Sequence, residues 1–398
     1  MMLEIKKLLR KRKLWIAMLC VLLCGILTAV DLNEKAALEH RDLYVNALEA
    51  ENKVKNQLFL LMSDETAGYF TTLSKKSEEL KAAIQKKDWK NVNKSFAEVN
   101  LLQARRVSAL YKTRNYDLYY HDYITQEDTL QTLRKERGLP EFTDSEIAAD
   151  WANEFMMGDE TQMFPYYQFT ARFYDQLEKQ HIDTLTYSTT DSSTLIVQFI
   201  RSLFPILPVI LITLLCFDMI HEDKDSGVLK TLLSQPRKRI HYLHQKMRSN
   251  MAALTAIFLV PLLLLSLCFA MFDHYDRVQA PVLANVHGLT SLEQMENTLT
   301  ETEVNNAMTY TLGITRYFSI PYHVQSPNTK FDLMPMWQFT GYVIVMALLV
   351  IAFCMLLNLL FNVICQNKMV SLVLTLAILL LGMGIAQPQN MEAWFAWL

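Results

Sequence analysis

The spacing of the residues that could take part in catalysis matches no known catalytic motif. His221 is followed by Glu222, but Asp225 stands where the zinc motif His-Glu-x-x-His needs its second histidine. His241 and His244 lie three residues apart among basic residues, which favours solvated side chains over metal ligands. The sequence contains neither the nucleophile elbow G-x-S-x-G nor the phosphate-binding loop G-x-x-x-x-G-K-[ST]. We therefore expect no catalytic residue, metal site or bound cofactor in this chain.

The cysteines offer no redox or metal chemistry either. They lie within or at the edge of long apolar runs, and none falls in the segment 31–194, so disulfides cannot stabilise that segment. We interpret them as small apolar residues of the core. The six are Cys20, Cys24, Cys216, Cys268, Cys354 and Cys365.

Five apolar runs are long enough to cross a membrane. A helix needs about 17–25 residues to cross roughly 30 Å of hydrocarbon. The first run follows a basic stretch, as in a signal peptide, but it is long for one and no cleavage site of small residues follows. We therefore expect an uncleaved anchor. The five predicted spans are 14–30, 195–219, 251–272, 339–365 and 369–386.

Basic residues near the ends of these spans predict the orientation of the chain. The N-terminal segment 1–13 and the segment 220–248 are rich in lysine and arginine, whereas the loop 273–337 has three such residues against seven acidic ones. Since positive charge favours the cytoplasmic side, we expect the first two segments in the cytoplasm. The segment 31–194 and the loop 273–337 then lie outside.

The external segment 31–194 has the pattern of a helical domain. Apolar residues recur at helical intervals, and Thr143 to Glu146 predicts a helix start with an acidic first turn. Its aromatic residues are dense from Tyr111 to Tyr174, which favours core packing over a ligand groove. The predicted fold is an all-α polytopic membrane protein of about five to six transmembrane helices, with a helical extracellular domain between the first two.

The segment 220–248 is the most distinctive part of the sequence. An acidic cluster precedes a short helix that is capped near Ser226 and stopped by Pro236, and a basic helix follows. Leu229, Leu232 and Leu233 share one face of the short helix by their spacing. Because that face is small and acids stand at its start, docking to a soluble partner is favoured over lying on anionic lipid.

This segment resembles the cytoplasmic signature of the ABC type-two exporter permeases. The resemblance rests on Asp225-Ser226-Gly227, Leu232-Leu233, Pro236-x-x-Arg239 and Lys246 before a span, and the order of spans and external domain also fits. Gln245 stands where many members have glycine. The resemblance implies that this segment contacts a separate ATPase subunit. The implied ATPase-coupling residues are Glu222, Asp225, Gly227, Leu229, Leu232, Leu233, Pro236, Arg239 and Lys246.

The resemblance also implies a function and partners. The chain would be the permease subunit of an ATP-driven exporter in a bacterial plasma membrane, with ATP on the partner ATPase and a peptide as the suggested substrate. Its partners would be ABC ATPase subunits, a second permease copy or a related permease, and the lipid bilayer. With a formal net charge of −3, nothing indicates nucleic acid. Arg201, Asn358 and Asn362 are candidates for a substrate path, although snorkelling and helix packing explain them equally well.

Two alternatives remain open from the sequence. The family's sixth span has no counterpart, since 387–398 is too short to recross and its tryptophans suit an interfacial or re-entrant segment. The chain is then a shortened permease, a truncated one, or one whose bundle another subunit completes. The second open question is the function itself: instead of a permease, the chain could be a receptor or immunity protein that binds an external peptide without an ATPase.

Overall fold

The computed structural model divides into two compact units, which we describe one at a time. The membrane unit contains Met1–Asn33, Thr190–Tyr275 and Trp337–Leu398, and the inserted unit contains Glu34–Thr189 and Asp276–Met336. Helices dominate both, in agreement with the predicted helical membrane protein. The structure describes residues 12–60, 64–114, 129–148, 164–185, 189, 191–203, 206–227, 239–272, 276–289 and 325–385.

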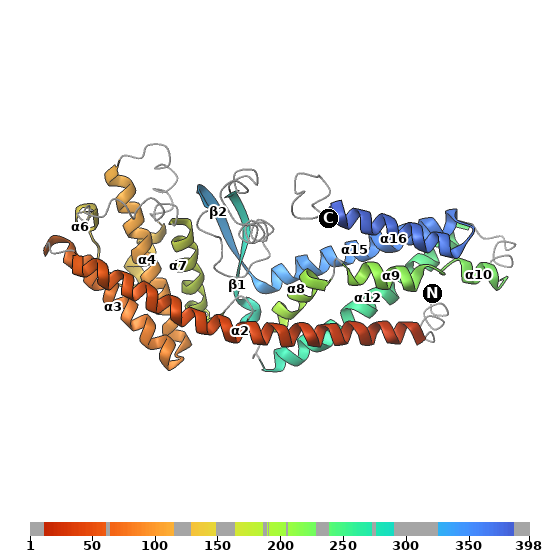
Figure 1. The fold of residues 1–398 in the computed structure, drawn as a ribbon, viewed down its shortest axis with the longest axis horizontal. Helices are drawn as coiled ribbons and strands as arrows, with labels where there is room; N and C mark the ends of the chain where they lie inside the picture. Colours follow the sequence, from red (N-terminus) through yellow and green to blue (C-terminus); the bar gives the residue numbers. More distant parts are fainter. Residues whose placement is uncertain are drawn as a thin grey trace. The chain divides into compact units, whose positions relative to one another are not determined.

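The membrane unit contains three helices that are long and apolar enough to cross a membrane, in the part of the chain that the structure describes. They cover Arg12–Leu38, His241–Met271 and Met336–Ile364, and so correspond to the first, third and fourth predicted spans. These stretches belong to α2 (Arg12–Leu60), α12 (Arg239–Phe272) and α15 (Met336–Ile364), all visible in Figure 1.

The two other predicted spans contain shorter helices. The run 195–219 contains α8 (Ser192–Leu203) and α9 (Leu207–Cys216), and Pro208 lies in the first turn of α9, where proline is tolerated. The run 369–386 contains α16 (Lys368–Ile385), whose apolar stretch is Lys368–Gly382. A count of spans above three therefore stays a prediction, and the tail 387–398 lies outside the described residues.

The helices of the membrane unit share an apolar core. Val21 of α2, Phe199 of α8, Ile212 of α9, Phe258 of α12 and Ile351 of α15 are almost completely buried in one cluster. α2 approaches α12 closely because Gly25 has no side chain: a Cβ there would lie 2.6 Å from Leu265 Cδ1. The outer faces of these helices leave large apolar side chains exposed, as expected for surfaces that meet lipid.

The inserted unit has a helical core around α4 (Trp89–Arg114). This helix packs against α3 (Asp64–Lys86), α6 (Asp144–Ala148) and α7 (Phe164–Lys179), which Figure 1 shows beside it. Aromatic side chains fill the interior: Tyr69, Phe70, Phe169, Phe173 and Tyr174 are buried. Several of the dense aromatic residues in the sequence therefore serve core packing.

Local capping signals of the inserted unit are confirmed. The Thr143 N–H donates to Glu146 Oε2 at 2.6 Å, and the Glu146 N–H donates to Thr143 Oγ1 at 3.3 Å, which is a capping box at the start of α6. At the turn before it, Gly138 has a φ of +65°, a conformation that glycine adopts without strain.

A β-hairpin departs from the predicted all-α fold. The all-α prediction had no strand in the loop 273–337, but β1 (Pro281–Leu289) and β2 (Gln325–Pro335) pair antiparallel, with Pro281 opposite Pro335. At the base of the hairpin the Met336 N–H donates to the Ala280 carbonyl oxygen at 2.8 Å. Since the two strands are separated by 35 residues, no short turn motif in the sequence marks their pairing.

Candidate functional site

The structure places the described coupling residues on two helices of the membrane unit. Glu222 and Asp225 lie on α10 (His221–Asp225), Gly227 follows it, and Lys246 lies on α12. Arg201 and Arg239 lie in α8 and α12, but their side chains are outside the described set. Leu229, Leu232, Leu233 and Pro236 lie outside the described residues, so their roles stay predictions.

α10 is a short helix with a defined end. The Ser226 N–H donates to the Glu222 carbonyl oxygen at 3.1 Å, and Gly227 has a φ of +72°, which a residue with a Cβ rarely adopts. Asp225 is exposed, and its carboxylate lies 3.9 Å from Lys368 Nζ. Glu222 is half-buried. The acidic residues chosen from the sequence are thus accessible on α10.

A buried ion pair joins α10 to α12. Lys246 Nζ lies 2.5 Å from Asp223 Oδ2, and the two side chains are only 6% and 2% exposed. The Tyr242 hydroxyl donates to the same carboxylate oxygen at 2.7 Å. Removing one partner of such a pair costs ~3–5 kcal/mol, because the other charge stays buried. We expect α10 and the start of α12 to move as one body.

Sequence reasoning selected Lys246 but missed Asp223. Nothing in the local pattern separates Asp223 from the neighbouring Glu222 and Asp225. The available signal was Lys246 itself, since a lysine next to a membrane span needs an acidic partner once it is buried.

A second set of buried contacts joins α10 to the end of α15. His221 Nδ1 lies 3.0 Å from Asn362 Oδ1, and its Nε2 lies 3.2 Å from the Cys365 carbonyl oxygen. Asn362 Nδ2 donates to the carbonyl oxygens of Cys216 and Asn358 at 3.3 and 2.8 Å. Both neighbours of the His221 ring are oxygen acceptors, so a neutral ring can donate to only one of them.

The candidate substrate-path asparagines are buried near these contacts. Asn358 and Asn362 are 0% and 3% exposed. Asn358 Nδ2 donates to the Cys354 carbonyl oxygen at 3.2 Å, while its Oδ1 has no hydrogen-bond partner within the described part of the chain. In this structure Asn358 bonds to helix backbone and Asn362 bonds to helix backbone and to His221, and contact with a substrate stays a prediction.

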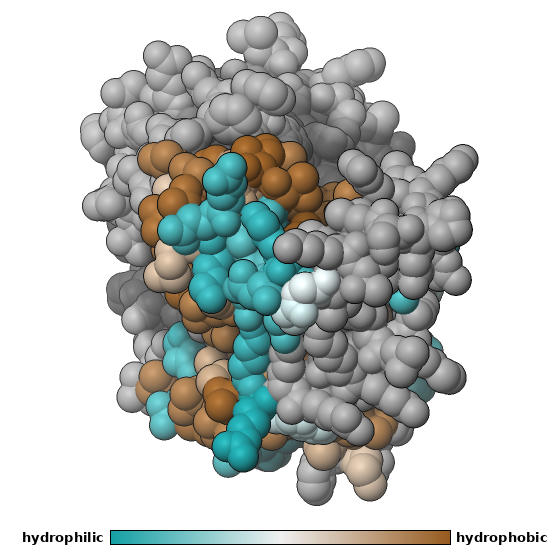
Figure 2. Space-filling model, turned by 90° about the vertical axis from the view of Figure 1, so that its right-hand side faces the viewer, coloured by the Kyte–Doolittle hydropathy of each residue, from teal (hydrophilic) through white to brown (hydrophobic). Residues whose placement is uncertain are grey.

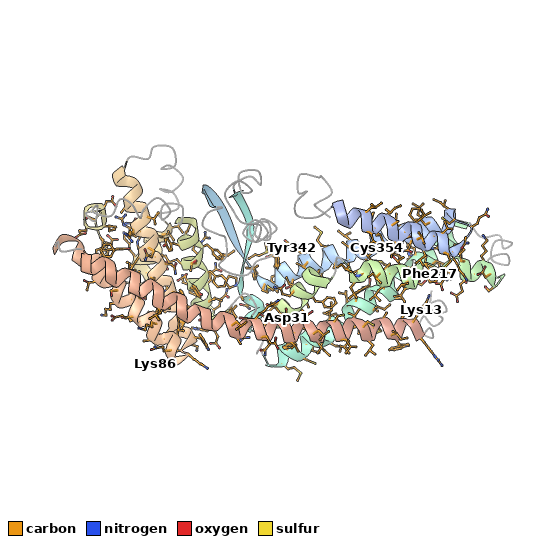
Figure 3. The ribbon with its side chains drawn as sticks, viewed as in Figure 1. Lys13, Asp31, Lys86, Phe217, Tyr342 and Cys354 are labelled. Carbon is orange, nitrogen blue, oxygen red and sulfur yellow. The ribbon has the colours of Figure 1, made fainter. Side chains whose placement is uncertain are left out.

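The start of α2 joins the same end of the unit. Lys13 Nζ lies 3.0 Å from both carboxylate oxygens of Asp218 and donates to the Leu215 carbonyl oxygen at 3.3 Å. It also lies 5.7 Å from the centre of the Phe217 ring, and Figure 3 labels both residues. Polar contacts therefore converge from α2, α10, α12 and α15. We call this set, centred on Asp223, Lys246, His221 and Asn362, the α10 junction.

The contacts of the α10 junction hold helices together. Across the described residues, no group of three or more His, Cys, Asp or Glu side chains could hold a metal ion. Figure 2 views the molecule from the side on which α10 lies in Figure 1, and there hydrophilic residues in teal lie beside hydrophobic residues in brown. The geometry supports a mechanical link at the end of the spans.

Comparison with known proteins identifies the family. Neither the curated proteins nor the solved structures contain a match to this chain. The family model of the ABC-2 family transporter proteins matches residues 1–391. With its long apolar helices and a match over nearly its whole length, the chain belongs to the ABC-2 transporter family as a multi-pass membrane permease that associates with ABC ATPase subunits.

Proposed function

We propose that this permease is an exporter subunit in which the segment 220–248 receives the ATPase and passes its movement to the membrane helices. The observation that carries the proposal is the α10 junction. α10 stands at the start of this segment and α12 at its end, and buried polar contacts tie α10 to both α12 and α15. Any force on the segment therefore reaches two membrane helices.

The energetics of the junction favour transmission over local yielding. Pulling Asp223 away from Lys246 would separate two buried charges. Separating them costs several kcal/mol, as does a mutation that removes one member of such a pair. Tilting α12 together with α10 keeps that pair. A push on α10 would thus tilt α12 and, through Asn362, α15.

The accessible residues of the segment suit contact with the ATPase. Asp225 is exposed on α10, and the predicted leucine face of Leu229, Leu232 and Leu233 follows it. An apolar face flanked by charges is the usual form of a helix that docks into a groove of a partner protein. In this proposal the leucines bind the ATPase and the α10 junction transmits its motion.

The charge distribution supports an orientation for the proposed exporter. The basic segments 1–13 and 220–248 would face the cytoplasm of a bacterium, and the inserted unit would lie outside the plasma membrane. Substrate would move along a path between this permease and a second copy or a related permease. A peptide is the substrate we suggest, because a sizeable external helical domain is compatible with it.

A double substitution of the leucine face tests the proposal. Leu232→Asp with Leu233→Asp should abolish co-purification of the ATPase from detergent extracts while membrane insertion stays normal, because two charges would desolvate poorly in an apolar groove. Thr231→Asp with Ser234→Asp adds the same charge to the other face of the predicted helix and should leave the ATPase bound. Retention of the ATPase by the leucine variant would count against the proposal. A wild-type chain that binds no ATPase would favour the receptor alternative.

A further inference from the structure

An apolar groove of about 650 Å³ lies between α12 and α15 in the membrane unit. Small side chains make it hollow: Ala252 and Thr255 line it on α12, and Ala352 lines it on α15. Leu356 of α15 is 47% exposed and forms part of its wall. The groove is therefore open on the outer surface of the unit rather than enclosed in the core.

One end of the groove carries a positive charge. Arg248 lines the groove near the α10 junction and is exposed, and no described acidic side chain forms an ion pair with it. His241 and His244 are also exposed and precede Arg248 on the same helix face by their spacing. Along this face of α12 the surface changes from basic to apolar at Arg248. In a bilayer such a change marks the boundary between lipid headgroups and acyl chains.

The length of the groove matches one leaflet. Its α12 side runs from Arg248 to Val260, twelve residues apart, which at 1.5 Å per residue is about 18 Å. Half of the hydrocarbon core is about 15 Å thick. A helix from a second copy crosses the whole core and would need a longer groove, whereas a single phospholipid occupies one leaflet.

We propose that this groove binds one anionic phospholipid in the leaflet at the α10 end of the membrane unit. Its phosphate pairs with Arg248, since a guanidinium forms charge-assisted hydrogen bonds with phosphate oxygens in a fixed fork geometry. One acyl chain lies along Ala252, Thr255 and Val260. The lipid bridges α12 and α15, the two helices that the α10 junction also connects.

Native mass spectrometry of the purified full-length chain tests the site. Phosphatidylglycerol or phosphatidylcholine with the same acyl chains is added, and the affinity of the first bound lipid is measured. We expect the wild type to prefer phosphatidylglycerol. Arg248→Gln should weaken phosphatidylglycerol binding about fivefold, the effect of one basic residue near anionic lipid, and remove the preference. Arg12→Gln is the matched control, because Arg12 is exposed at the start of α2 outside the groove, and should leave the affinity unchanged.

A steric variant tests the apolar part independently of charge. Ala252→Leu with Thr255→Leu fills the groove and should weaken both lipids by about tenfold, an expected loss of about 1.4 kcal/mol. Cys268→Leu enlarges an exposed side chain further along α12, outside the groove, and should have no effect. Thermal unfolding of each variant in detergent confirms that it is folded.

Three results would overturn the proposal. Wild-type phosphatidylglycerol affinity in both Arg248→Gln and the groove-filled variant would show that the lipid binds elsewhere. Glycerol phosphate that competes as well as the intact lipid would show that a free phosphate, rather than a lipid, is the ligand. Altered self-association of the groove-filled variant, with unchanged lipid binding, would assign the groove to a second copy.

Discussion

Each unit contains a buried ion pair, but the surroundings of the two pairs differ. The membrane unit has Asp223 with Lys246, and the inserted unit has Asp175 with Arg137. The first pair is 2% and 6% exposed, and the Tyr242 hydroxyl is its additional partner. In the second, Arg137 Nη2 lies 2.6 Å from Asp175 and also pairs with Glu178, and Asp175 pairs in turn with Lys179, which is 59% exposed. The first pair is sealed, and the second is connected to solvent.

Apolar side chains show the opposite difference in exposure: they are more exposed in the membrane unit than in the inserted unit. The membrane unit leaves Leu27 and Met271 68% and 72% exposed, whereas the inserted unit buries Tyr69 and Phe173 completely. A unit in water is stabilised by burying apolar surface, and its ion pairs lie at the edge of the core. A unit in lipid gains little from such burial, so its polar contacts determine how its helices are joined. The comparison explains why the α10 junction is the candidate site for transmission.

The largest effect is expected when the sealed pair loses its cation. Lys246→Met leaves the charge of Asp223 buried without its cation and should lower the free energy of unfolding by ~3–5 kcal/mol. The double variant Asp223→Leu with Lys246→Met removes both charges and should recover most of that loss. Unfolding of the purified full chain in detergent, followed by heat and by denaturant, measures all three.

Lys368→Met is the matched control for this experiment. Lys368 lies at the same end of the membrane unit and pairs with Asp225 at 3.9 Å, but both side chains are more than half exposed. Exposed pairs contribute ~0–1 kcal/mol, so little change is expected. If Lys246→Met destabilises the chain no more than Lys368→Met does, the sealed pair is not a structural joint.

A smaller effect is expected from the cluster in the inserted unit. Burial lowers the pKa of Arg137, but hydrogen bonds to Asp175 and Glu178 outweigh it and raise the pKa overall. Arg137→Met should destabilise the packing of α7 by only ~2 kcal/mol, because Asp175 keeps its contact with Lys179 at 2.9 Å and solvent reaches Glu178. Hydrogen exchange of α7 peptides in the full-length chain measures the change.

Lys135→Met is the control for the Arg137 variant, since Lys135 and Glu141 form an exposed pair at 3.3 Å. It should leave exchange of α7 unchanged within error. A loss for Arg137→Met as large as that for Lys246→Met would remove the distinction between sealed and solvent-connected pairs.

The smallest effect is expected at the capping box of α6, where Thr143 is exposed. Hydrogen bonds from the Thr143 backbone and hydroxyl lower the pKa of Glu146 from its ordinary value of 4.5. Because the folded pKa is the lower one, this stabilisation is present above pH 4.5 and is lost as the pH falls through the folded pKa. NMR titration of labelled glutamate in the full-length chain should show that Thr143→Val raises this pKa. A titration unchanged by Thr143→Val would show that the Thr143 hydroxyl does not act on the carboxylate.

Local composition and spacing were sufficient for several features. Hydropathy located the helices that cover Arg12–Leu38, His241–Met271 and Met336–Ile364, because the requirement to span hydrocarbon acts on each segment by itself. The spacing of Thr143 and Glu146 predicted a helix start for the same reason, since both partners lie within one turn. The degenerate pattern from Asp225 to Lys246 pointed to the ABC type-two permeases, and the family match confirms that resemblance.

Contacts between distant residues were decided by the tertiary structure alone. His221 contacts Asn362, which is 141 positions away in the sequence. Asp223, rather than one of its acidic neighbours, pairs with Lys246 because of the way α10 packs against α12. The pairing of β1 with β2 likewise depends on strands far apart in the chain. Periodicity and capping report which face of an element is apolar and where it begins, but a buried charge finds its partner only when two elements meet, and no local pattern encodes that meeting.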